Sequence, residues 1–262
     1  MQILHHESEL PQLRRQKILL LLERDGKVTA SELVQHFGVS EDTIRRDLAE
    51  LSSAGLLQRV HGGALPRPVD TGKDYFTRIN EPNEAKRHLA QLAAGRVEDG
   101  QIVMFDSGTT TLHIAQSLRP EISITGVTNS PMIAMTLAGY KNITVILAGG
   151  QINPATMASS GHETVRLIQS IKADLMFTGV CAVHPEVGIS TLHFDEVAVK
   201  RAMLESATQV IAVTSADKLG AVEPFVLAPC THLHTMITER YVASGDIGAY
   251  RDLGIDVQQV DV

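Results

Sequence analysis

Hydrophobic residues recur with helical spacing near the start of the chain. Residues 13–24 form one such segment, and it ends at Gly26, a residue type that commonly terminates helices. A shorter segment, residues 30–37, follows Thr29, and Glu32 stands three positions after that threonine. A threonine and a glutamate at this spacing form a capping box, in which each side chain accepts a hydrogen bond from the other residue's backbone. The pattern therefore predicts a long helix followed by a short one.

A third helix is predicted to begin after Ser40, and Gly38 before it suits the left-handed end of the second helix. Its apolar stripe, spaced i, i+4 and i+7, consists of Ile44, Leu48 and Leu51. We expect a separate polar face made of Thr43, Arg46, Asp47 and Glu50, with Arg45 at its side. Residues 56–60 then have strand character, and glycines 62 and 63 form a turn. This order of elements is that of a winged helix-turn-helix.

After residue 75 the pattern changes to short apolar strands that alternate with helices, beginning with a helix over residues 83–95. The expected strands cover residues 102–106, 122–127, 143–147, 174–178, 209–214 and 234–238, and helices such as 110–118, 163–171 and 195–207 lie between them. This alternation indicates an α/β domain with a mostly parallel sheet and helices on both faces. We therefore expect a winged helix-turn-helix domain (1–66), a linker with two prolines (67–75) and an α/β domain (76–262).

Composition adds mainly exclusions to this picture. The 262 residues are 44% hydrophobic and 20% charged, which is typical of a globular protein with a buried core. No apolar run is long enough to span a membrane, and the first residues do not resemble a secretion signal. The two cysteines, Cys181 and Cys230, are not in a CxxC spacing, which favours a cytoplasmic protein without disulfides. His232 and His234 would share a strand face without a third ligand nearby, so we expect no metal site and no cofactor.

Charge limits how this chain can bind nucleic acid. The formal net charge is -7, and residues 1–66 carry eight lysines and arginines against nine acidic residues, a net charge of -1. A strongly positive field is therefore absent from the predicted head, and any DNA contact depends on a few well-placed cations.

The start of the third helix offers such cations together with hydroxyl groups. Sequence-specific binding places a rigid helix in the major groove, where arginine can bond guanine and serine or threonine can bond bases or phosphates. The candidate DNA-binding residues are Ser40, Thr43, Arg45 and Arg46, with Arg59 and His61 from the hairpin. The alternative is a solvated helix with an ion pair between Asp42 and Arg46, but the capped second helix, the glycine turn and the hairpin favour DNA.

Polar and glycine residues follow three of the predicted strands. Ligands of parallel sheets bind at the carboxyl ends of strands, and phosphates favour loops that lead into helix N-termini. The candidate effector-binding residues there are Asp106, Ser107, Gly108, Thr109, Thr110, Thr128, Asn129, Gly149 and Gly150. Gly108 would let the backbone approach an anion closely, although a hydroxyl after a strand is more often a simple helix cap. Lys200 and Lys218 are candidate cations; for Lys200 the alternative is a surface ion pair with Glu196, four residues earlier.

These motifs together resemble those of the DeoR family of transcription regulators. The run Val-Ser-x-x-Thr-Ile-Arg-Arg-Asp-Leu at residues 39–48 and the run Arg-x-His-Gly-Gly-Ala at residues 59–64 are similar to that family's signature. The resemblance continues over nearly the whole chain, through Asp106-x-Gly-Thr-Thr, Thr128-Asn, Gly149-Gly, Glu196-x-x-Val-Lys-Arg and Lys218-x-Gly. It departs at residues 215–220, where Ser-Ala-Asp-Lys-Leu-Gly replaces the usual Asp-x-Ser-Lys-Phe-Gly, so the exact ligand contacts there do not transfer.

The resemblance implies an operator-binding head and a sensor domain similar in fold to ribose-5-phosphate isomerase. We accordingly expect a repressor of a carbohydrate-utilisation operon, a homodimer or homotetramer, that a phosphorylated sugar or polyol releases from double-stranded operator DNA. It also adds Glu196 to the effector-binding set. Two alternatives stay open. One is a sugar-phosphate isomerase or transferase with a DNA-binding head, using Asp106, Glu196 and Lys200 as acid–base groups. The other is a constitutive DNA-binding protein with a vestigial sensor.

Overall fold

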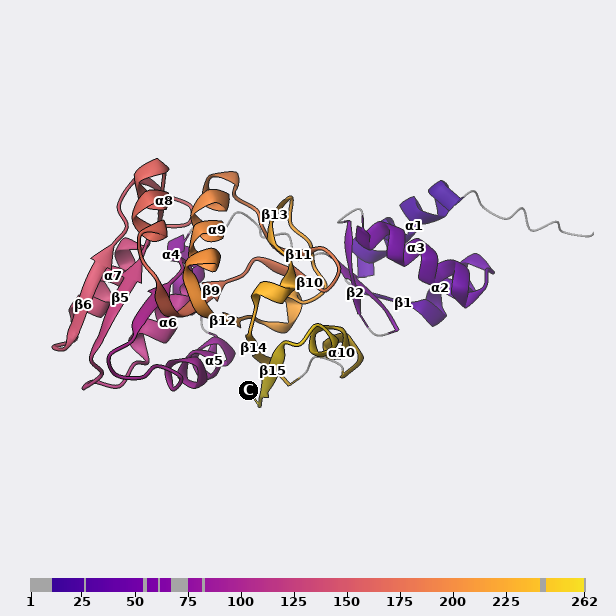
Figure 1. The fold of residues 1–262 in the computed structure, drawn as a ribbon. Helices are drawn as coiled ribbons and strands as arrows, with labels where there is room; N and C mark the ends of the chain where they lie inside the picture. Colours follow the sequence, from indigo (N-terminus) through magenta and orange to yellow (C-terminus); the bar gives the residue numbers. More distant parts are fainter. Residues whose placement is uncertain are drawn as a thin grey trace, which may run out of the picture. The chain divides into compact units, whose positions relative to one another are not determined.

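The chain folds as two units, Met1–Thr71 and Gly72–Val262, which we call the N-terminal and C-terminal units (Figure 1). The computed structural model describes residues 11–25, 27–53, 56–60, 62–66, 75–81, 83–240 and 244–261. Most of the expected linker, residues 67–74, lies outside the described residues. Tyr75, expected at its end, instead begins a helix of the C-terminal unit and is fully buried.

The N-terminal unit contains the three predicted helices, α1 (Pro11–Asp25), α2 (Ala30–Phe37) and α3 (Glu41–Ser53). The predicted hairpin is also present, as β2 (Leu57–Val60) and β3 (Gly63–Pro66), and a short strand that we did not predict, β1 (Val28–Thr29), completes the sheet in the order β1-β3-β2. Gly63 is required where β3 pairs with β1, because a Cβ there would lie 2.1 Å from the Val28 carbonyl oxygen. The winged helix-turn-helix is therefore built as the pattern indicates.

The caps of α2 and α3 form as predicted. The Thr29 hydroxyl accepts a hydrogen bond from the Glu32 amide at 3.2 Å, and the Glu32 carboxylate accepts one from the Thr29 amide at 2.9 Å. Gly38 ends α2 in the left-handed region, with φ 63°. The Ser40 hydroxyl then accepts a hydrogen bond from the Thr43 amide at 3.2 Å. These local bonds fix the turn that orients α3.

Our assignment of Asp47 to the polar face of α3 is wrong. Its carboxylate is 2% exposed and accepts hydrogen bonds from Arg14 Nε at 2.5 Å and Arg15 Nε at 3.0 Å, both on α1. Asp47 lies three residues after Ile44 and four before Leu51, so it belongs on the same side of the helix as the apolar stripe. A buried ion pair therefore joins α1 to α3 beside the hydrophobic core.

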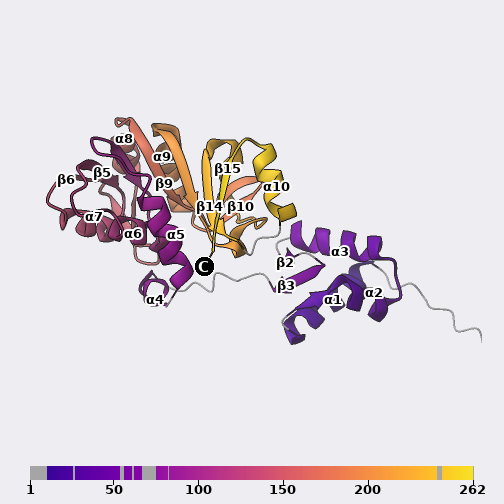
Figure 2. The same cartoon turned by 90° about the horizontal axis from the view of Figure 1, so that it is seen from below.

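A seven-stranded parallel sheet forms the centre of the C-terminal unit (Figure 2), in the order β15-β14-β12-β9-β4-β5-β6. Its strands are β4 (Ile102–Phe105), β5 (Ile124–Thr128), β6 (Ile143–Leu147), β9 (Ala173–Gly179), β12 (Ala207–Val213), β14 (Thr235–Glu239) and β15 (Asp256–Val260). The first six match the predicted strands, and β15 was not predicted. The expected α/β class is confirmed. No helix within the described part of the chain is long and apolar enough to cross a membrane.

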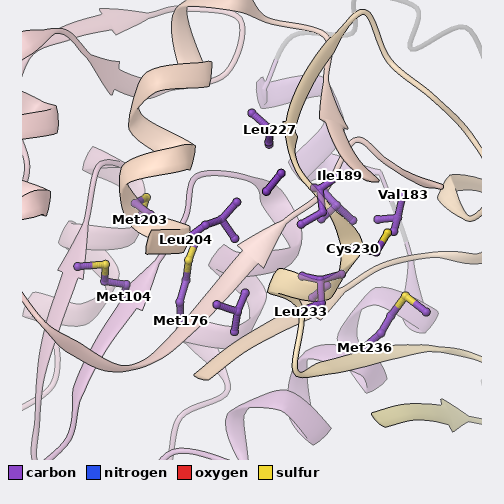
Figure 3. Packing of buried hydrophobic residues seen from close by; sticks show 14 of the residues in the cluster. Met104, Met176, Val183, Ile189, Met203, Leu204, Leu227, Cys230, Leu233 and Met236 are labelled. Atoms are coloured by element: carbon purple, nitrogen blue, oxygen red, sulfur yellow. The ribbon is translucent and has the colours of Figure 1, made fainter. Parts of the chain in front are cut away.

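Helices cover both faces of this sheet, because alternate residues of each strand point to opposite sides. On one face Phe105 and Phe177 pack with helices α5 (Glu84–Ala94), α6 (Thr109–Gln116) and α7 (Pro131–Ala138). On the other, Met104 and Met176 pack with helices α8 (His162–Gln169), α9 (Val197–Ser206) and α10 (Ser244–Asp252), and Figure 3 shows part of this second cluster. The two packed layers hold the carboxyl ends of the strands in fixed positions.

Several short elements of the C-terminal unit were not predicted. Three antiparallel strands, β10 (Ala182–His184), β11 (Gly188–Thr191) and β13 (Phe225–Ala228), form a small second sheet. Strands β7 (Gln151–Asn153) and β8 (Ala158–Ser160) form a hairpin, here called the β7–β8 hairpin. Helix α4 (Tyr75–Asn80) precedes α5, and 3-10 turns cover Phe194–Glu196, Ala216–Lys218 and Cys230–His232. Helix α4 precedes the strands of the main sheet in the sequence, and the other short elements lie between them.

Candidate functional site

The exposed side of α3 carries the candidate DNA-binding residues. Arg45 and Arg46 are exposed, and so is Arg59 on β2. The ion pair that forms on α3 joins Arg45 to Asp42 at 2.6 Å, between two exposed side chains, so our alternative pairing of Asp42 with Arg46 is wrong. The Ser40 and Thr43 hydroxyls lie 2.9 Å apart at the start of the helix. The remaining candidate, His61, lies outside the described residues.

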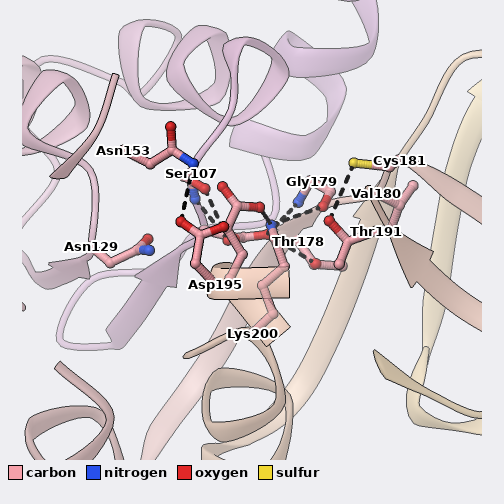
Figure 4. Close-up of polar contacts among 12 residues, drawn as sticks. Ser107, Asn129, Asn153, Thr178, Gly179, Val180, Cys181, Thr191, Asp195 and Lys200 are labelled. Carbon is pink, nitrogen blue, oxygen red and sulfur yellow. Dashed lines mark hydrogen bonds and ion pairs between the residues drawn. The ribbon is translucent and has the colours of Figure 1, made fainter. Parts of the chain in front are cut away.

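Three charged side chains meet at the carboxyl edge of the main sheet, and we call them the buried trio: Asp106, Glu196 and Lys200. Figure 4 labels Lys200 and its neighbours Thr178 and Gly179. The Lys200 ammonium lies 2.6 Å from Asp106 Oδ2 and 3.7 Å from a Glu196 carboxylate oxygen. Asp106 directly follows β4, whereas Lys200 comes from α9. The surface ion pair that we considered for Lys200 is therefore wrong, because Lys200 is 3% exposed and its shorter ion pair is to Asp106.

Backbone and hydroxyl donors complete the coordination of Asp106. Its Oδ1 accepts a hydrogen bond from the Ser107 amide at 2.8 Å, and its Oδ2 accepts from the Gly179 amide at 3.1 Å and the Thr178 hydroxyl at 3.3 Å. Thr178 and Gly179 were missed at the sequence level, although they end β9 and the strand-end rule applies to them equally. A Cβ on Gly179 would lie 2.9 Å from the Ser107 carbonyl oxygen, so this close approach requires glycine.

The protonation of the buried trio follows from its geometry. Burial alone would lower the pKa of Lys200, but the charges of Asp106 and Glu196 outweigh burial and the pKa is raised. Burial raises the pKa of Asp106, and Lys200 opposes this effect. Lys200 therefore remains an ammonium at neutral pH, and its charge offsets the cost of burying Asp106.

Three buried polar atoms around the trio have no hydrogen-bond partner among the described residues: Glu196 Oε1, Asn129 Oδ1 and Ser130 Oγ. Two of these atoms are pure acceptors, and a buried acceptor without a donor costs about 1–3 kcal/mol. A ligand hydroxyl or an ordered water would satisfy them. The site is therefore suited to a molecule with several hydroxyl groups.

The start of α6 offers unpaired backbone amides at the same edge. Gly108 precedes the helix with φ 131°, a conformation that favours glycine, and nothing lies within 4 Å of the position its Cβ would take. Within the described residues no side chain caps this helix, and the Ser107 amide bonds Asp106 instead. The amides of Thr109 and Thr110 thus begin a helix that can bind an anion.

The other candidates are distributed more widely. Asn129 bonds the β7–β8 hairpin, donating from Nδ2 to the Ser159 carbonyl oxygen at 3.1 Å, and Thr128 is fully buried beside it. The glycine pair packs against its own neighbours: Gly149 accepts a hydrogen bond from the Thr164 hydroxyl at 2.7 Å, and a Cβ on Gly150 would lie 2.3 Å from the Ser160 carbonyl oxygen. A packing role accounts for this pair without a ligand.

Lys218 does come close to the trio. Its ammonium donates to the Val180 carbonyl oxygen at 2.9 Å, and the preceding residue, Gly179, accepts from Lys200 at 3.5 Å. Asp217, in the segment that departs from the family pattern, is exposed. No group of three or more histidine, cysteine or acidic side chains that could hold a metal ion occurs within the described ranges.

Comparison with known proteins places both units. Residues 14–66 match the family model for the DeoR-like helix-turn-helix domain, and residues 81–240 match that for the DeoR C terminal sensor domain. The HTH-type transcriptional regulator GlpR of Haloferax volcanii is 38% identical over 213 residues, covering 80% of this chain and 83% of that protein. The glycerol-3-phosphate regulon repressor of Escherichia coli K12 is 31% identical over 207 residues, covering 79% and 82%. Ribose 5-phosphate isomerase A of Methanocaldococcus jannaschii matches with a TM-score of 0.39 and 15% identity, over 52% of this chain and 53% of its own.

Proposed function

The chain belongs to the DeoR family of transcription regulators, and from this premise we propose that it represses a carbohydrate-utilisation operon until a phosphorylated sugar or polyol releases it. The observation that carries the proposal is the pairing, in one chain, of a capped helix with an exposed cationic side and a cluster of buried polar side chains whose acceptors lack donors. One relative is named a glycerol-3-phosphate regulon repressor, which supports a phosphorylated polyol as the effector class.

In this proposal α3 contacts the major groove. Arg45 and Arg46 supply the cations, Ser40 and Thr43 supply hydroxyls near the helix start, and the β2–β3 wing adds Arg59 and the sequence candidate His61. A cytoplasmic dimer or tetramer would present two such helices to successive major grooves. Because the head is nearly neutral, these few side chains provide most of its DNA affinity.

The buried polar side chains of the C-terminal unit bind the effector in this proposal. Sugar hydroxyls would donate to Glu196 and Asn129, and the amides at the start of α6 would receive a phosphate. The effector then displaces the operator if each of them binds a different conformation of the protein more tightly. A coupling free energy of about 1–3 kcal/mol between the two sites is typical.

A catalytic role receives less support. The Asp106 carboxylate already accepts hydrogen bonds from Ser107, Gly179 and Lys200, and Lys200 stays protonated because its pKa is raised. These two groups are therefore not free to act as a general base. Glu196 Oε1 does have an unused lone pair, but the relatives that match this chain are named transcription regulators. We therefore propose that the chain is not an enzyme, and turnover of ribose 5-phosphate by the purified protein would contradict this.

The function is tested by gel shift on an operator that the protein has first selected from random DNA. We expect at least one member of a panel of phosphorylated sugars and polyols to weaken operator binding roughly 5–150-fold. The matching unphosphorylated compounds serve as controls and should leave the affinity unchanged. If no member of the panel changes the affinity, effector control is wrong and the chain binds its operator constitutively.

Arg46→Ala should weaken operator binding by about 1–3 kcal/mol, roughly 5–150-fold, without unfolding the N-terminal unit. Arg46 is exposed and lies off the apolar stripe, so its removal costs DNA contacts and little stability. Fluorescence anisotropy with labelled operator measures the affinity, and circular dichroism confirms folding. Arg24→Ala is the matched control, because it removes the same charge from the exposed end of α1. An Arg46→Ala variant that binds as tightly as the native protein at physiological salt would show that another face contacts DNA.

A further inference from the structure

Three cations outside the buried trio gather near the carboxyl edge of the main sheet: Arg78 on α4, Lys86 in the first turn of α5 and Lys218 after β12. Arg78 Nη2 donates to the Ala155 carbonyl oxygen, in the turn of the β7–β8 hairpin, at 3.2 Å. Lys218 donates to Val180, directly beside the carbonyl that receives Lys200. We call these three residues the cation cluster.

The cluster is close enough for its charges to act on one another. The pKa of Lys86 is lowered, first by burial and then by the charge of Lys218, and Arg78 contributes in the same direction. Two carboxylates, Glu81 and Asp217, oppose this effect without reversing it. Half-buried cations that raise one another's energy are stabilised when an anion joins them.

Arg78 adds a second and independent sign of a missing ligand. Its Nε is buried and has no hydrogen-bond partner among the described residues. The Thr156 hydroxyl, one residue after the carbonyl that Arg78 does bond, is also buried without a partner there. A guanidinium presents paired N–H groups whose geometry matches the oxygens of a phosphate, so an unused N–H in a cationic site favours that class of anion.

We propose that Arg78, Lys86 and Lys218 bind the phosphate group of the effector, beside the start of α6. The inference rests on the proposed function and deepens it, since it divides the pocket into two ends. Phosphate oxygens meet the cation cluster, and sugar hydroxyls meet the unpartnered acceptors of Glu196 and Asn129. Neither Arg78 nor Lys86 was among the residues that the sequence singled out.

In this arrangement the phosphate of the effector contacts α4 directly, through Arg78. Helix α4 is the first described element of the C-terminal unit, and it follows the segment that we expect to be the linker. Tyr75 fixes one end of α4 in the core, and Arg78 joins its other end to the β7–β8 hairpin. A phosphate that binds Arg78 therefore acts on the helix nearest in sequence to the DNA-binding unit.

The test uses inorganic phosphate as the probe, with the full-length protein in isothermal titration calorimetry. We expect phosphate to bind the native protein, and its dissociation constant to rise roughly tenfold or more in Arg78→Met and in Lys86→Met. Arg87→Met is the matched control, because Arg87 is the exposed neighbour of Lys86 on the same helix and should bind phosphate as the native protein does. Lys86→Arg keeps the charge and should stay within a few-fold of the native value. Circular dichroism confirms that each variant is folded.

Two results would overturn the inference: native protein that binds no phosphate, or Arg78→Met and Lys86→Met variants that bind it normally. These failures are separable from failure of the proposed function. If a phosphorylated compound releases the operator equally from native protein and from both variants, the repressor function stands and the cation cluster is the wrong subsite. If phosphate binding depends on Arg78 and Lys86 but no compound releases the operator, the subsite stands and effector control does not.

Discussion

Lys200→Met should destabilise the C-terminal unit by about 3–5 kcal/mol, the usual cost of removing one partner from a buried ion pair. Methionine matches the length of the lysine side chain but leaves Asp106 and Glu196 buried without their shared cation, at 0% and 4% exposure. Asp106 keeps its hydrogen bonds from Ser107 and Gly179 but loses the one from Lys200, so the variant removes the compensating charge together with one hydrogen bond. Hydrogen exchange with mass spectrometry measures this loss of stability. We expect faster exchange in β4, β9 and α9 and no change in α2 and α3.

Two variants separate the effect of charge from that of packing. Arg166→Met breaks an exposed ion pair with Glu163 on α8, and such pairs contribute at most about 1 kcal/mol, so exchange should stay close to native. Adding Asp106→Asn and Glu196→Gln to Lys200→Met removes the uncompensated charges and should restore part of the lost protection. Native exchange in Lys200→Met alone would mean that the buried trio does not support the sheet.

Asp47→Ala should unfold much of the N-terminal unit and abolish operator binding. The substitution removes the buried carboxylate that pairs with Arg14, which is 5% exposed, and the loss of about 3–5 kcal/mol is comparable to the whole stability of a domain this small. Arg15 is less affected, because its side chain is 26% exposed and also pairs with Glu50. Urea unfolding followed by circular dichroism gives the stability, and gel shift gives the affinity.

The control for Asp47→Ala is Asp42→Ala on the same helix. Asp42 pairs with Arg45 in solvent, both side chains being more than 60% exposed, so its removal should change stability by less than about 1 kcal/mol. Near-native stability and operator affinity in Asp47→Ala would contradict the assignment of Asp47 as the residue that fixes α3 against α1.

Local signals explain why so much of the N-terminal unit could be predicted. The Thr29 and Glu32 cap, the Gly38 turn and the Ser40 cap each involve residues within three or four positions of one another. The six predicted strands of the main sheet were also recognisable, since most of their apolar residues are buried between the helical layers of a parallel sheet, although β6 at the edge is only partly buried. By contrast, β13 pairs with the distant strand β11, and Ala228 opposite Ile189 is a contact that no local pattern encodes.

The same distinction accounts for the errors at charged positions. Lys200 follows Glu196 by four residues, which indicates a local pair, but its shorter contact is with Asp106, 94 residues away. Asp47 was placed in solvent because acidic residues are rarely buried, and its partner Arg14 is 33 residues away on α1. The strand-end rule did collect Asp106 and its neighbours, because parallel strands bring their carboxyl ends to one edge. It could not find Arg78 or Lys86, which reach that edge from helices.

One side of α3 packs in the core and the other side is exposed, and this difference affects how such regulators can evolve new specificities. Asp47 and the apolar stripe hold the helix in place, whereas Arg45 and Arg46 project from it without supporting the fold. If these arginines contact the operator as we propose, substitutions at the two positions should change operator preference at little cost in stability. After gene duplication, one copy could then come to recognise a new operator sequence by surface substitutions alone, and the protein would stay folded at every step. The same positions are the ones to exchange when the DNA-binding unit is redesigned for another operator.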